Sequence, residues 1–339
     1  MRILIVTDAW FPQVNGVVRT LSTVGKELEA LGHAVKFVTP ADFRTVPMPT
    51  YPEIRLSLNP FGGVARAFED FKPEAIHIAT EGPLGFAARR YCVKRKLPFT
   101  SSFHTKFPEY IQARTGLPVG LAYAVVRWFH GAAQRTMVAT ASLQRELEER
   151  GFERMVRWTR GVDLDLFRPR DKDFLDAPRP VYLYVGRIAV EKNIQAFLDL
   201  DLDGTKVVVG DGPQLEDCRR RYPAVRFVGA KHGEDLARYY AAADVFVFPS
   251  RTDTFGNVML EALAAGVPVA AFPVTGPNDV INGFGVGCLN EDLAQAARSA
   301  LEIPGERCRD HAATMSWRAC AEQFLGNLAP VATEEPTAT

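Results

Sequence analysis

Short apolar runs alternate with longer segments of helical periodicity along the chain. The first run, 2–6, is followed by apolar residues at three- and four-residue intervals between 17 and 31, and then by the run 35–38. This order predicts a strand, an amphipathic helix and a second, parallel strand. Three further short segments of predicted strand follow in the first half: 75–78, 99–102 and 137–140. The first half therefore predicts a parallel sheet with helices on both faces.

The pattern is interrupted once and then resumes. Residues 162–180 are rich in Asp, Arg and Pro and show little periodicity, which indicates a linker. Five apolar runs follow: 181–185, 206–209, 225–228, 245–248 and 267–271. They predict a second doubly wound domain, and a chain of 339 residues suits two cores better than one. The predicted divisions are a first domain 1–165, a second domain 166–309, a helix 310–328 that packs back across the domains, and a disordered tail 329–339.

Composition excludes several classes of protein. Forty basic and forty acidic residues balance, so the chain lacks the overall basic signature of a nucleic-acid-binding protein. Five cysteines, odd in number and without a CxxC pair, argue against a disulfide framework and a zinc site. The apolar run at the N-terminus is too short for a signal peptide, and no stretch approaches the ~20 apolar residues of a membrane span. We therefore expect a cytoplasmic protein.

Ligands of open parallel sheets bind beyond the carboxyl ends of the strands, so the loops that follow the predicted strands are the candidates for chemistry. The first of these loops leads to Gly16 at the start of a helix, where free amides favour an anion. Gly16 is a phosphate-binding candidate, and a plain helix start is the alternative. A dinucleotide-binding GxGxxG motif, expected directly after the first strand, is absent from the sequence.

Two cations follow the first strand of the second domain. Arg187 comes directly after the strand, and Lys192 lies at the predicted start of the next helix. A guanidinium fork and an ammonium point charge could converge on a diphosphate. Solvated surface charges are the alternative, and the position of both residues after a strand end favours the site.

The loop after the strand 245–248 holds the richest set of polar residues. It carries Asp253, and the amides of Thr254, Phe255 and Gly256 precede a helix that contains Glu261. Amides at a helix start bind phosphate, and two carboxylates beside such a site suggest hydrogen bonds from sugar and ribose hydroxyls. Helix capping is the alternative for Asp253, whereas a buried, unpaired Glu261 would be costly.

These motifs together resemble the family 4 glycosyltransferases, over nearly the whole chain. The matching stretches, in the expected order, are Asn15-Gly16-Val17, Gly186-Arg187, Glu191-Lys192-Asn193, 210–213 and 249–268. The family signature of two glutamates separated by seven residues is here Asp253 and Glu261, so the first carboxylate is one methylene shorter. The resemblance implies the α/β GT-B fold, with two Rossmann-like doubly wound domains facing an interdomain cleft, and a retaining transfer from a nucleotide-diphosphate sugar.

The resemblance also implies roles for single residues. His104, which follows a first-domain strand, would contact the donor hexose near the reacting centre, together with Asp253. Arg187, Lys192 and helix dipoles would take the place of a divalent ion at the leaving diphosphate, so we expect no metal and no cofactor besides the nucleotide sugar. A lone histidine in a core is the alternative interpretation of His104.

The acceptor is indicated only by a surface pattern. A predicted first-domain helix carries a cluster of basic residues, and the following apolar segment 117–129 ends in aromatic residues. The residues of this candidate acceptor or membrane surface are Arg89, Arg90, Lys94, Arg95, Lys96 and Trp128. A basic surface with aromatic residues is typical of peripheral enzymes on anionic membranes. A solvated helix beside a buried one is the alternative.

The sequence therefore predicts a hexosyltransferase. Its donor would be a UDP- or GDP-sugar of the glucose, mannose or glucuronic acid type, and its acceptor a membrane lipid such as diacylglycerol at the inner face of the membrane. A glycan acceptor stays open, as does a sugar-nucleotide 2-epimerase of the same fold or a sugar-nucleotide sensor. The missing GxGxxG motif disfavours a nicotinamide oxidoreductase.

Overall fold

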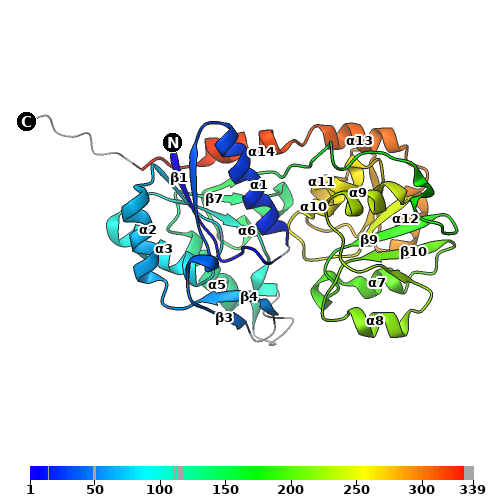
Figure 1. Cartoon of the computed structure of the whole chain (residues 1–339), viewed down its shortest axis with the longest axis horizontal. Coiled ribbons are helices and arrows are strands. Elements are labelled where there is room, and N and C mark those ends of the chain that lie inside the picture. Colours follow the sequence, from blue (N-terminus) through cyan, green and yellow to red (C-terminus); the bar gives the residue numbers. More distant parts are fainter. Residues whose placement is uncertain (14, 49–50, 110–111, 113–117, 332–339) are drawn as a thin grey trace, which may run out of the picture. The chain divides into compact units, whose positions relative to one another are not determined.

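The computed structural model divides the chain into two compact units. Unit 1 contains residues 1–159 and 317–339, and unit 2 contains residues 160–316. The structure describes residues 1–13, 15–48, 51–109, 112 and 118–331, with the backbone alone for 51–53. Figure 1 shows a parallel sheet with flanking helices in each unit.

The sheet of unit 1 has the strand order β2-β1-β5-β6-β7-β8, with all pairings parallel. Its strands are β1 (Arg2–Val6), β2 (Ala34–Val38), β5 (Ala75–Ile78), β6 (Thr100–Phe103), β7 (Arg135–Val138) and β8 (Met155–Arg157). Its helices are α1 (Gly16–Ala30), α2 (Phe61–Phe71), α3 (Pro83–Arg95), α5 (Val119–His130), α6 (Ala141–Glu149) and α14 (Trp317–Asn327). A 3-10 turn η1 (Pro40–Asp42) and the antiparallel pair β3 (Thr45–Met48) and β4 (Tyr51–Ser57) lie between β2 and α2.

Alternation along β1 explains the two helical layers of unit 1. Ile3 and Ile5 pack with α1 and α14, whereas Leu4 and Val6 pack with α2 and α3. Since successive side chains of a strand point to opposite faces, a continuous apolar run is what a sheet covered on both sides requires. Figure 1 shows α14 lying along α1.

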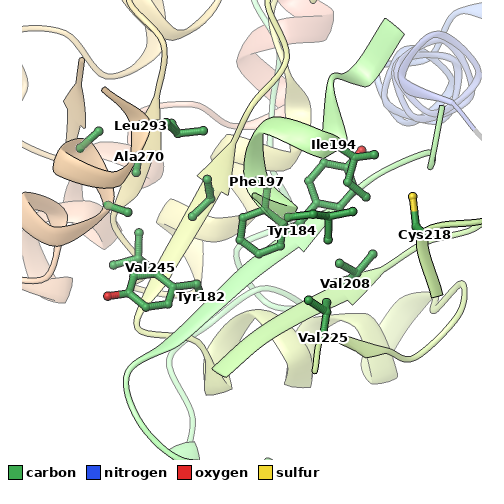
Figure 2. Packing of buried hydrophobic residues seen from close by; sticks show 14 of the residues in the cluster. Tyr182, Tyr184, Ile194, Phe197, Val208, Cys218, Val225, Val245, Ala270 and Leu293 are labelled. Carbon is green, nitrogen blue, oxygen red and sulfur yellow. The ribbon is translucent and has the colours of Figure 1, made fainter. Parts of the chain in front are cut away.

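The sheet of unit 2 has the order β11-β10-β9-β12-β13-β14 and is also parallel. Its strands are β9 (Val181–Val185), β10 (Thr205–Val209), β11 (Arg226–Phe227), β12 (Val245–Phe248), β13 (Val269–Ala271) and β14 (Gly287–Leu289). Its helices are α7 (Ile194–Leu198), α8 (Leu215–Arg221), α9 (Gly233–Ala242), α10 (Asn257–Ala264), α11 (Pro277–Val280), α12 (Leu293–Ala300) and α13 (Gly305–Ala313), with 3-10 turns η2 (Lys172–Phe174) and η3 (Val190–Lys192). Figure 2 shows one face of its core, where Tyr184 and Phe197 pack between β9 and α7.

The boundaries differ from the predicted ones at two places. Residues 162–180, predicted as a linker with the first domain ending at residue 165, belong to unit 2, which begins at residue 160. Val162 forms a parallel bridge with Ser316, and the guanidinium group of Arg309 donates to the carbonyls of Leu164 and Phe167 at 2.9 and 2.6 Å. These bonds satisfy the backbone of a segment that has little apolar periodicity of its own.

The C-terminal segment also differs from the prediction. In place of one helix 310–328, the chain forms α13 in unit 2 and α14 in unit 1. Residues 329–331 are not disordered, because Pro330 bridges Ala75 and the amide of Val331 donates to the carbonyl of Glu74 at 2.7 Å. The rest of the predicted tail, 332–339, lies outside the described residues.

Candidate active site

In unit 2, the loops after β9 and β12 meet at the point where the strand order reverses. The order runs outward from β9 to β10 and β11 on one side, and from β12 to β13 and β14 on the other. The chain therefore leaves β9 and β12 toward opposite sides, which opens a crevice between their carboxyl ends. The loop after β9 carries Arg187 and Lys192, and the loop after β12 carries Asp253.

Glycine backbone lets neighbouring loops lie close together at this edge. A Cβ on Gly210 would overlap the carbonyl oxygen of Gly186, so the loop after β10 can reach the loop after β9 only because this position lacks a side chain. The amide of Ile188 donates to the carbonyl of Asp211 at 2.9 Å, and Asp211 accepts the amide of Gly212 at 2.7 Å. Asp211 thus stabilises a turn.

Lys192 and Asp253 form an ion pair between the two loops. Their side chains are 26% and 17% exposed, so the pair is reachable from solvent. Two flanking bonds fix the loops: the Asn193 side chain donates to the carbonyl of Pro249 at 3.0 Å, and the Thr252 hydroxyl donates to the carbonyl of Glu191 at 3.2 Å. The structure therefore brings together one predicted cation and one predicted carboxylate.

The helix after Asp253 begins without a capping side chain at its first position. Gly256 is the residue before α10, with φ = 85°, a left-handed conformation that favours glycine. Thr254 is half-buried, Phe255 is buried, and Glu261 is buried within α10. Arg187 is half-buried, and its carbonyl accepts the hydroxyl of Tyr184 at 2.7 Å. These residues lie close to Lys192 or Asp253 in the sequence. Their loops follow the carboxyl ends of β9 and β12, as the loops of the ion pair do.

Unit 1 holds the other predicted site residues, His104 and Gly16. His104 follows β6, is buried, and meets Trp158 edge-to-face with ring centroids 5.6 Å apart. Two residues later, Lys106 donates to Glu146 on α6 at 2.7 Å, which anchors the loop that carries His104. Gly16 begins α1, but the Asn15 side chain already accepts the amides of Val17 and Val18, both at 3.0 Å. The phosphate role of Gly16 stays a prediction.

Asp8 is a buried carboxylate at the strand-order reversal of unit 1 that the sequence analysis did not single out. It follows β1 and accepts the amides of Leu84 and Gly85 at 2.8 and 3.2 Å and the hydroxyl of Thr80 at 2.9 Å. Burial raises the pKa of Asp8 to about 6, against these hydrogen bonds, which lower it. Asp8 therefore occupies the start of α3 as an internal anion. Its only sequence signal is its position after the first strand.

The residues of the predicted basic surface fall into two groups: some are held by hydrogen bonds or ion pairs within unit 1, and the others are exposed. Arg89 is bound to the end of α5, donating to the carbonyls of Phe129 and Trp128, both at 2.9 Å, and Arg95 pairs with Glu69 at 3.3 Å. The remaining predicted basic residues, Arg90, Lys94 and Lys96, are exposed, as is Trp128. Residue 117, at the edge of the predicted apolar segment, lies outside the described residues.

No group of three or more His, Cys, Asp or Glu side chains is placed to hold a metal ion in the described part of the chain. Of the helices that the structure describes, none is long and apolar enough to cross a membrane.

Known proteins resemble this chain in both halves. A family model described as Glycosyltransferase Family 4 matches residues 14–166, and one described as Glycosyl transferases group 1 matches residues 179–303. A GDP-mannose-dependent alpha-mannosyltransferase of Mycobacterium tuberculosis is 30% identical over 85% of this chain and 83% of its own length. The chain belongs to glycosyltransferase family 4. This family 4 glycosyltransferase is a hexosyltransferase, as predicted from the sequence.

Two further similarities concern the acceptor and the fold. An alpha-monoglucosyldiacylglycerol synthase of Streptococcus pneumoniae is 30% identical over 89% of this chain and 78% of its own length. A sucrose-phosphate synthase structure from Thermosynechococcus elongatus superposes with a TM-score of 0.76 at 20% identity, covering 96% of this chain and 97% of the other. The two Rossmann-like units confirm the predicted GT-B fold class.

Proposed function

We propose that this glycosyltransferase retains the anomeric configuration and transfers a hexose from a UDP- or GDP-sugar to a hydroxyl group of a membrane lipid. The observation that carries the proposal is the Lys192–Asp253 ion pair at the strand-order reversal of unit 2. A cation beside a helix start without a capping side chain suits a diphosphate, and a carboxylate beside it suits sugar hydroxyls. The acceptor is proposed from the diacylglycerol named for the Streptococcus relative.

The two units differ in a way that supports placing the nucleotide on unit 2. In unit 1, the starts of α1 and α3 are occupied by the side chains of Asn15 and Asp8. An incoming phosphate would have to displace them, and against Asp8 it would also meet a carboxylate. At the start of α10, Gly256 offers no side chain to compete for the amides. The diphosphate therefore has the better electrostatic partner in unit 2.

In the proposed reaction, Lys192 and the start of α10 bind the diphosphate and stabilise the charge that grows on it as the bond to the anomeric carbon breaks. Arg187 supplies a second cation from the same loop. Asp253 exchanges its ammonium partner for donor hydroxyls. The acceptor hydroxyl bonds to the anomeric carbon on the face that the phosphate leaves, and its proton passes to the departing phosphate oxygen. These cationic groups do what a divalent ion does in metal-dependent transferases.

The test is a transfer assay with UDP-glucose and GDP-mannose, each with EDTA, using diacylglycerol in mixed micelles or a soluble glycan as acceptor. The proposal expects a glycolipid product with the donor's anomeric configuration by NMR. Lys192→Ala should weaken nucleotide-diphosphate binding by roughly ten- to a hundredfold, the value of a charge-assisted hydrogen bond. Arg219→Ala, an exposed cation on α8 paired with Glu216, is the matched control. Transfer to the glycan alone, or an epimerised donor without acceptor, would contradict the proposal.

A further inference from the structure

Helix α5 presents a stripe of apolar side chains to solvent. Leu121, Val125 and Trp128 are 65%, 49% and 56% exposed, and Ala124 between them is exposed as well. Their spacing of three and four residues places them on one face of the helix. The other large exposed apolar side chains of the described residues do not form such a run on one helix. We call these four residues the α5 stripe.

The opposite face of α5 is fixed in the core of unit 1. Tyr123 and Val126 are buried with Phe103 of β6 and Leu143 of α6. This packing determines which face points outward, so the helix cannot rotate to bury the stripe without emptying that cluster. Because loss of buried side chains of this size destabilises a core strongly, the outward direction of the stripe is a stable property of the fold.

Trp128 is held in a defined position at the end of the stripe. The Arg89 guanidinium lies 3.6 Å from the centre of its ring and donates to the backbone carbonyls of Trp128 and Phe129. Phe86 stacks with the ring at a centroid distance of 6.1 Å and an interplanar angle of 23°. Arg89 therefore acts as a positioning residue for Trp128, because it fixes both the ring and the helix end that carries it.

The two helices around the stripe carry charge of one sign. Neither α3 nor α5 contains an acidic residue. Arg90, Lys94 and Lys96 are exposed at α3, and Arg127 is exposed on α5 beside Trp128. Glu69 of α2 pairs with Arg95. An apolar stripe bordered by cations is complementary to a surface that is apolar inside and anionic outside.

We propose that the α5 stripe inserts into an anionic lipid surface while the exposed cations of α3 contact the headgroups. This deepens the proposed function, on which its link to catalysis rests, since it identifies the surface through which unit 1 reaches a lipid acceptor. It also moves the centre of membrane contact from the basic helix α3 to Leu121, Val125 and Trp128. Each exposed cation is expected to raise vesicle affinity about fivefold. Burial of one large apolar side chain adds on the order of ten- to a hundredfold.

The test measures binding of the full chain to vesicles of phosphatidylcholine with and without 30% phosphatidylglycerol, by co-sedimentation at roughly physiological salt. The inference expects binding to the anionic vesicles and loss of more than about a hundredfold in affinity for the Leu121→Gln, Val125→Gln double variant. Leu301→Gln, which removes an exposed apolar residue of unit 2, should leave affinity unchanged. Equal affinity of the double variant and the parent chain would overturn the inference.

Trp128 provides an independent readout. Trp158 and Trp317 are buried and Trp10 is half-buried, whereas Trp128 is exposed, so tryptophan quenching by brominated phosphatidylcholine should come mainly from Trp128 and fall sharply in Trp128→Phe. Arg89→Lys keeps the positive charge but loses the planar guanidinium group that holds Trp128. This variant should therefore lower quenching more than Lys94→Gln does. Unchanged quenching in Trp128→Phe would overturn the insertion geometry. Folding of every variant is checked by far-ultraviolet circular dichroism and by thermal unfolding.

The proposed function and the docking surface fail in distinguishable ways. If the double variant loses vesicle binding but still glycosylates a short-chain diacylglycerol in detergent, both proposals are supported. If the chain glycosylates a lipid but its vesicle binding does not depend on the α5 stripe, the proposed docking surface is wrong and the lipid acceptor stands. Stripe-dependent vesicle binding without any lipid glycosylation supports the surface and contradicts the lipid acceptor. Self-association through the stripe, without vesicle binding, overturns the surface in favour of a second copy of the chain.

Discussion

Replacement of Asp253 by asparagine separates the two halves of the proposed donor site. Asparagine keeps the size of the side chain and its capacity to hydrogen-bond, but it removes the negative charge that Lys192 neutralises in the structure. The ammonium group then no longer pairs with a carboxylate at this position. We therefore expect the Asp253→Asn variant to bind UDP and GDP more tightly than the parent chain and to transfer the sugar more slowly.

The magnitude follows from the geometry of a shared cation. A phosphate oxygen bound to Lys192 would lie about 5 Å from the Asp253 carboxylate, a distance at which two unit charges repel by about 3 kcal/mol at an effective dielectric constant near 20. Side chains that are 26% and 17% exposed are partly screened, so about 1–2 kcal/mol is a better expectation. This corresponds to a five- to thirtyfold gain in nucleotide affinity. The gain should shrink as the salt concentration rises.

The loss in transfer has a separate cause. Asp253 is expected to accept hydrogen bonds from donor hydroxyls, and a hydrogen bond to a charged group contributes about 1.5–3 kcal/mol, or roughly ten- to a hundredfold in rate if it is made in the transition state. Isothermal titration with UDP and GDP measures the first effect, and steady-state kinetics with the active donor measures the second.

One result would refute this reasoning. If Asp253→Asn weakens nucleotide binding as much as Lys192→Met does, and the double variant is no worse than either, then Asp253 serves to hold Lys192 in place. The two residues would then act as a unit, and the charge repulsion would be smaller than the cost of losing that orientation.

Three further predictions address the fold around the sites. Gly210→Ala should lower the free energy of unfolding by more than about 3 kcal/mol in a denaturant titration, because the added methyl group overlaps the Gly186 carbonyl. A change of less than about 1 kcal/mol would show that the two loops separate easily. For Asp8, the folded pKa of about 6 lies above the unfolded value of 3.8, so its contribution to stability is full below pH 3.8 and is lost as the pH rises through 6. The unfolding free energy of the parent chain minus that of Asp8→Asn should therefore fall by about 3 kcal/mol between pH 3 and 7, and a flat difference would contradict the burial argument. Phe324→Ala should lower the stability of unit 1 by about 3–5 kcal/mol in thermal unfolding, while UDP and GDP binding persists. Gly326→Ala is the control and should leave stability unchanged, because no atom lies within 4 Å of the added methyl group.

The sequence predicted the interior of the fold well because strands covered on both faces have an unambiguous signature. The predicted runs 75–78, 181–185 and 245–248 coincide with β5, β9 and β12. The edge strands β8 and β14 and the pair β3–β4 were not predicted. They are short or half-exposed, so their apolar content does not stand out from that of a loop.

The candidate site was predictable where a motif follows a strand, and less so where its role depends on a partner distant in the sequence. Lys192 and Asp253 were both predicted, but their pairing was not, because 61 residues separate them. Asp8 was passed over because it is joined to α3 by residues more than 70 positions away. Of the α5 stripe, only Trp128 was predicted. The exposure of Leu121 and Val125 was not, because it depends on which face of the helix packs against the core.

The return of α14 to unit 1 affects how the chain can fold while it is being synthesised. Ile3, Ile5 and Trp158 bury part of their surface against α14, yet residues 160–316 lie between β8 and that helix. At about 5–20 residues per second, roughly ten to thirty seconds pass between emergence of residue 159 and of residue 327. Unit 2 is complete first, and throughout that interval one face of the earlier sheet is covered by α1 but lacks α14. Nascent chains of this protein should therefore depend on holding chaperones during that period, and a chain truncated at residue 316 should aggregate through its first half.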